Sequence, residues 1–223
     1  MCTWKITGED DRLDYCPDHA QKTLIYARTY TIGENYKHSG TNQLIFNLKR
    51  RTTASQGALY HKKEAIRQFA DEASVFLSRH EKSRQLCLVP MPSSKIASHP
   101  EYDDRIEQVA ERVSLRLRSR ATHLLMLEAI TNRQPSHLGG SRNEVGASMK
   151  INDAAIEKYD PSSVIVIIDD VLTSGAHFSA AFKHIRSRLP NAEIVGLFWA
   201  KAQDPNFTTP SEGTFLSEDL IDF

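Results

Sequence analysis

The stretch "VIVIIDDVLTSGAHF", residues 164–178, constrains the fold more than any other part of the chain. Five aliphatic residues lead directly into two adjacent aspartates, and a loop with two hydroxyl side chains and a glycine follows before a helical pattern begins. An unbroken aliphatic segment of this kind is typical of a strand that is covered on both faces, as in a parallel sheet. Ligands of such sheets bind beyond the carboxyl ends of the strands, so we expect the two carboxylates and the loop at a binding site.

The rest of the chain alternates between short apolar strands and amphipathic helices, which predicts an α/β fold with a Rossmann-like parallel sheet and helices on both faces. Residues 41–50 are open to two interpretations, a strand or the start of a helix. We expect a small N-terminal hood over 1–58, a core over 59–204 and a tail over 205–223. The expected strands are 24–32, 84–92, 123–127 and 192–200, and the expected helices are about 59–79, 103–119 and 175–189.

Composition excludes several classes of protein. Lysine plus arginine number 28 and aspartate plus glutamate number 28, so the formal net charge is zero, which argues against a bulk electrostatic grip on nucleic acid. No apolar segment approaches membrane-spanning length, and the N-terminus does not resemble a signal peptide. Three cysteines are too few for a disulfide scaffold, so we expect a reducing, cytoplasmic location.

The acidic pair and the loop behind it have a chemical interpretation. Asp169 and Asp170 at a strand end suit the binding of vicinal hydroxyls, or of a magnesium ion through water. Residues 173–177 open a helix whose unpaired N–H groups attract phosphate, and Gly175 leaves room for the anion. The segment therefore predicts a ribose-5-phosphate site. A P-loop nucleotidase is excluded because no Gly-Lys pair occurs in the chain. The alternative to a ligand site is purely structural: the aspartates would simply cap the following helix.

This segment resembles a known family. "IVIIDDVLTSGAH" is similar to the phosphoribosyl pyrophosphate (PRPP) signature of the type I phosphoribosyltransferases, and it departs at His177, where that family usually has threonine or serine. The order of "NQLIFNLKRR", "CLVPMPSSK" and "RQPSHLGGSRNEVGA" before it resembles the ComF-like branch over about residues 24–200. The resemblance implies the type I phosphoribosyltransferase fold.

The resemblance also implies roles for individual residues, with Asp169 and Asp170 at the ribose hydroxyls and at Mg²⁺. A mobile segment over the site, residues 131–150, would bring Arg133, His137 and Arg142 to the leaving group. Asp169, Asp170, Lys95 and Arg133 are thus the catalytic candidates. The expected PRPP contacts are Ser93, Ser94 and Lys95 for the diphosphate, and Val171, Leu172, Thr173, Ser174, Gly175, Ala176 and His177 around the 5-phosphate.

The implied activity is the transfer of phosphoribosyl from PRPP to a nitrogen acceptor such as a nucleobase, with release of pyrophosphate. The alternative is a non-catalytic PRPP or nucleotide sensor, or a subunit of a complex. Family members are commonly dimers, so a homodimer is a further expectation. The ComF-like branch often carries an N-terminal zinc ribbon of four cysteines, for which this chain offers only Cys2, Cys16 and His19.

Overall fold

The computed structural model describes residues 3–8, 13–16, 18, 21–80, 84–133 and 144–205. Their centre is a six-stranded sheet with the order β1-β2-β8-β7-β3-β4, in which β1 pairs antiparallel with β2 and all other neighbours are parallel. A separate antiparallel pair, β5-β6, lies apart from it. The strands are β1 Lys5–Ile6, β2 Leu24–Thr31, β3 Leu86–Pro90, β4 Ala121–His123, β5 Leu127–Ala129, β6 Met149–Ile151, β7 Val164–Leu172 and β8 Ile194–Gln203.

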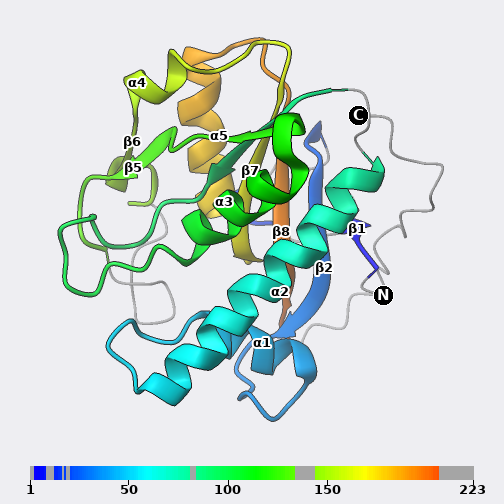
Figure 1. Cartoon of the computed structure of the whole chain (residues 1–223), viewed down its shortest axis with the longest axis vertical. Coiled ribbons are helices and arrows are strands. Elements are labelled where there is room, and N and C mark those ends of the chain that lie inside the picture. Colours follow the sequence, from blue (N-terminus) through cyan, green and yellow to red (C-terminus); the bar gives the residue numbers. More distant parts are fainter. Residues whose placement is uncertain are drawn as a thin grey trace.

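Helices cover both faces of the sheet, as the sequence predicts (Figure 1). One hydrophobic cluster joins the first three helices to one face and includes Phe69 stacked on Trp199, with 5.0 Å between ring centroids. A second cluster joins α5, the β5-β6 pair and residues 13–16 to the other face, where Phe178 packs against Phe198. The helices are α1 Gly40–Leu48, α2 Gln56–His80, α3 Arg105–Leu117, α4 Asp153–Ile156 and α5 Ala176–Arg188.

The central strand β7 positions the site. All nine of its residues are buried, and the strand continues through Asp169 and Asp170 to Leu172 rather than ending before the acidic pair. Its register places Pro90 of β3 opposite Ile168. β3 therefore ends beside Ile168, and the two aspartates lie in β7 just past that point.

The structure decides one open expectation and contradicts another. The segment 41–50 is mostly helix α1, because Ser39 caps it and its hydroxyl accepts a hydrogen bond from the Asn42 amide at 3.0 Å. The strand expected over 123–127 is wrong. The Leu124 amide still donates to Leu88, but the chain then turns, and the next strand, β5, pairs with β6 outside the main sheet.

The N-terminal third contributes to the same layers as the rest of the chain. β1 and β2 extend the central sheet beside β8, and α1 packs against α2. Among the described residues, no helix combines the length and apolar character needed to cross a membrane.

Candidate functional site

The turn from β7 into α5 leaves a helix start without a side-chain cap. Gly175 occupies the N-cap position with φ of 79°, no side chain caps the helix, and its first turn contains no acidic residue. The first N–H groups of a helix have no partner inside the helix and carry a partial positive charge. Thr173 is exposed and His177 half-buried, so this end of α5 combines donors with partial access to solvent. The arrangement suits an anion.

Gly175 has a second reason to be glycine, which the sequence did not reveal. A Cβ built on it would lie 2.7 Å from the Cβ of Cys16 and 3.5 Å from that of Leu13. The amide of Tyr15 also donates to the carbonyl of Ser174 at 3.0 Å. Residues 13–16 therefore pack directly on the turn, and both this contact and the positive φ require glycine.

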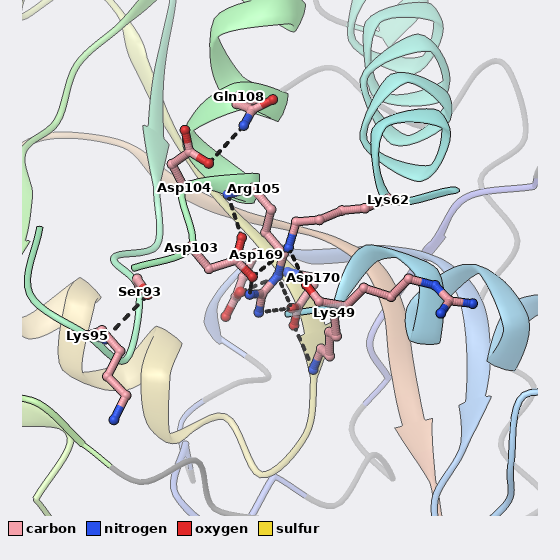
Figure 2. Close-up of polar contacts among 11 residues, drawn as sticks. Lys49, Lys62, Ser93, Lys95, Asp103, Asp104, Arg105, Gln108, Asp169 and Asp170 are labelled. Carbon is pink, nitrogen blue, oxygen red and sulfur yellow. Dashed lines mark hydrogen bonds and ion pairs between the residues drawn. The ribbon is translucent and has the colours of Figure 1, made fainter. Parts of the chain in front are cut away.

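The two aspartates point to opposite sides of the sheet, as successive strand residues do. Asp170 faces the layer of α1–α3, where Arg105 donates to its Oδ2 from Nε at 3.1 Å and from Nη2 at 2.7 Å. Lys49 at the end of α1 lies 3.1 Å from Oδ1 (Figure 2). Burial opposes ionisation of Asp170, but Lys49 and Arg105 outweigh it and hold the pKa of that carboxyl well below its usual range.

The pairing extends beyond Asp170. Arg105 also donates to Asp103 at 2.7 Å, and Lys62 of α2 donates to Asp103 and to the carbonyl of Arg50, each at 2.7 Å. Burial lowers the pKa of Lys62, and Asp103 partly offsets this effect. Sequence reasoning missed this network, because Asp170 and Arg105 are 65 residues apart and Lys49 stands in the basic stretch 49–51, a composition that is typical of a solvated surface.

Asp169 faces the α5 side of the sheet. Its Oδ1 accepts the amide of Asp170 at 2.8 Å, and its Oδ2 lies 3.8 Å from Nδ1 of His177. Arg133 is nearby: burial lowers the pKa of its guanidinium, and the charge of Asp169 partly restores it. The structure thus brings together three of the residues that the sequence singled out.

The segment after β3 lies beside this group. The Met91 amide donates to Ile168 of β7 at 2.8 Å, and the Arg133 amide donates to the carbonyl of Ser94 at 2.8 Å. Ser93 accepts the amide of Lys95 at 3.3 Å, while the Lys95 side chain extends away from the labelled aspartates (Figure 2). The residues expected at the diphosphate are therefore joined to both β7 and the Arg133 segment through the backbone.

The remaining candidate residues are either buried or outside the described part of the chain. Val171 and Leu172 are buried in the two hydrophobic clusters, so only their backbone is available to a ligand. His137 and Arg142 lie outside the described residues, as do Cys2 and His19.

The carboxylates of Asp169 and Asp170 do not form a magnesium site by themselves. Both oxygens of Asp170 contact cationic side chains, which disfavours a metal ion there, and Asp169 offers a single carboxylate. Within the described residues, no group of three or more histidine, cysteine, aspartate or glutamate side chains is arranged to hold a metal.

The chain has low sequence identity and low TM-scores to known proteins. No protein-family model matches the chain, and no curated protein matches its sequence. Among solved structures, an adenine phosphoribosyl transferase from Trypanosoma brucei has a TM-score of 0.44 at 11% identity, covering 86% of this chain and 90% of its own. A hypoxanthine phosphoribosyltransferase from Staphylococcus aureus has a TM-score of 0.38 at 13% identity, covering 64% and 74%. The adenine phosphoribosyltransferase of Leishmania tarentolae has a TM-score of 0.38 at 10% identity, covering 81% and 91%.

Proposed function

We propose that this protein is a phosphoribosyltransferase-like protein of the ComF-like type that binds PRPP and transfers its phosphoribosyl group to a nitrogen acceptor. The observation that carries the proposal is that separate parts of the chain come together at one edge of the sheet. The loop 173–177, the segment 93–95 and Arg133 come from distant parts of the sequence. Backbone hydrogen bonds join Arg133 to Ser94 and Met91 to Ile168 of β7, and the loop directly follows β7, so all three lie at the edge of the sheet where β3 ends. This edge is where parallel sheets bind ligands.

In this proposal, different residues bind different parts of PRPP. The uncapped start of α5 would hold the 5-phosphate, and Oδ2 of Asp169, which lies 3.8 Å from Nδ1 of His177, would accept a ribose hydroxyl. Ser93, Ser94 and Lys95 would face the diphosphate with Arg133. When the C1–O bond breaks, negative charge grows on the leaving diphosphate, and fixed donors and cations stabilise it.

Magnesium enters the proposal as a companion of the diphosphate rather than as an ion that the protein binds alone, because the described side chains do not form a site for it. The protein's own contribution is to position the sugar phosphate and to exclude water from the reacting carbon.

Calorimetric titration with PRPP, with and without Mg²⁺, tests the binding. We expect Lys95→Gln to lower affinity for PRPP by about tenfold and to leave affinity for ribose 5-phosphate unchanged, since a charged hydrogen bond to the diphosphate is lost. Lys150→Gln is the matched control, because Lys150 forms an exposed ion pair with Glu128 away from these residues. If wild-type protein bound neither ligand, the proposal would be wrong.

Catalysis is tested by pyrophosphate release in the presence of PRPP and a panel of purine and pyrimidine bases. Release of pyrophosphate supports the proposal that the protein is an enzyme. Tight binding without release supports the alternative, a PRPP sensor or complex subunit, which His177 favours because it replaces the hydroxyl that the resembled signature carries at this position.

A further inference from the structure

The two adjacent aspartates have different hydrogen-bonding capacity. A carboxylate accepts about four hydrogen bonds in all. Asp170 receives two from Arg105 on Oδ2 and one from Lys49 on Oδ1. Asp169 receives one, from the amide of Asp170, and its Oδ2 has no hydrogen bond among the described residues. Both side chains are about equally buried, with 10% of Asp169 and 7% of Asp170 exposed, so capacity rather than access separates them.

Asp170 is part of a continuous network of charged groups. Arg105 bridges Asp170 and Asp103, and Lys62 joins Asp103 to the backbone after α1. Three cations thus surround two carboxylates and connect α1, α2 and the start of α3 to β7 (Figure 2). Removing one partner from such a buried set leaves an uncompensated charge, which is strongly destabilising.

The network reaches Asp169 through the backbone. The amide that fixes Oδ1 of Asp169 belongs to Asp170, whose side chain Arg105 and Lys49 hold. The orientation of the Asp169 carboxylate, and hence the direction of its Oδ2 beside His177, depends on where Asp170 is anchored.

We infer that Asp169 alone reads the sugar diol, and that Asp170 is a positioning residue which anchors α1 and α3 to β7 and orients Asp169. This inference rests on the proposed function, since it concerns the ribose of the same ligand. It departs from the sequence-based expectation, in which both acids touch the ribose hydroxyls and the metal.

The test compares affinity for ribose 5-phosphate with affinity for inorganic phosphate, because their ratio isolates what the sugar contributes. We expect Asp169→Asn to lower this ratio by about tenfold with little change in Tm. Asp170→Asn and Arg105→Gln should each lower Tm by about 10 °C, and the double variant should lose no more than either single one. The two single changes should also alter the ratio equally, because both act through one pair.

A direct role of Asp170 gives a different pattern: Asp170→Asn would lower the ratio about tenfold while Arg105→Gln preserved it, and this result would overturn the inference. Where these variants do not fold, Lys49→Gln decides, because Lys49 is 38% exposed and supplies only one contact. The ratio should stay unchanged or fall slightly, because Arg105 still holds Asp170 through two hydrogen bonds. A rise of about fivefold or more would show Oδ1 of Asp170 taking a hydroxyl and would also overturn it.

Failure of the inference is distinguishable from failure of the proposed function. If the wild-type protein bound neither ribose 5-phosphate nor phosphate, the proposed function would fail and the inference with it. If it bound both with equal affinity, the phosphate site would stand and the reading of the diol by Asp169 would be overturned. Asp153→Asn, an aspartate in an exposed ion pair, is the control for the substitution itself.

Discussion

At the scale of single residues, Gly175 has little freedom to vary. Its backbone has φ of 79°, and an added Cβ would lie 2.7 Å from that of Cys16. We expect Gly175→Ala to lower the free energy of unfolding by about 2–4 kcal/mol, since strain and overlap add together. Urea denaturation measures this. Gly57→Ala is the control: nothing lies within 4 Å of its added Cβ, and a gain of about 0.5 kcal/mol is expected in a helix. Equal effects of the two changes would contradict the packing of residues 13–16 on this turn.

Single residues also show which features of the site the sequence does not predict. The types and order of residues 169–177 predict an anion-binding turn, because a strand end, hydroxyls and glycine are local features. The partners of Asp170 are not local: Arg105 and Lys49 reach it only through tertiary packing, and no spacing in the sequence connects them. The close contact of Cys16 with Gly175 is hidden for the same reason.

At the scale of elements, Glu72 joins α2 to β2 and β8. It pairs with Arg28 and accepts a hydrogen bond from the Trp199 indole at 2.7 Å. Burial raises its pKa, but the hydrogen bonds from Arg28, Trp199 and Gln68 outweigh this and hold the pKa below 4.5. The folded state then binds fewer protons than the unfolded state, so this stabilisation is full above about pH 4.5 and is lost as pH falls through the lowered pKa.

We therefore expect Glu72→Gln to lower stability at pH 7 by about 2–4 kcal/mol and to reduce the loss of stability between pH 5 and pH 3. Denaturation followed by tryptophan fluorescence at several pH values measures both. Glu64→Gln is the control, because Glu64 lies on the same helix and pairs with Arg67 at the surface. A pH dependence as steep as that of the wild type would show that Glu72 is not the group responsible.

Elements differ in how far the sequence predicts them. β7 and α5 follow from an aliphatic run and a helical period, and the structure confirms both. The segment 123–127 has the same apolar character, yet only its end residues lie in strands, His123 in β4 of the main sheet and Leu127 in β5 of the small one. Periodicity detects burial, but it does not say against which sheet a residue is buried.

At the scale of the whole molecule, one sheet separates two hydrophobic clusters and belongs to both. Alternate residues of β7 face opposite sides, with Val164, Val166 and Ile168 in one cluster and Ile165 and Ile167 in the other. Neither cluster keeps its packing when the strand is lost. The two sides of the molecule should therefore unfold together, as a single cooperative transition.

Natural reporters lie on each side of the sheet and test this directly. Trp4 and Trp199 belong to the first cluster, while the buried Cys16 and Cys87 belong to the second. Burial raises the pKa of the Cys87 thiol to about 12 and also raises that of Cys16, so both should resist thiol reagents until they are exposed. In a Cys2→Ser background, tryptophan fluorescence and thiol labelling should give the same urea midpoint. Labelling of Cys16 at lower urea than the fluorescence change would mean that residues 13–16 leave the α5 turn before the sheet unfolds, which would uncover the start of α5 while the rest of the fold persists.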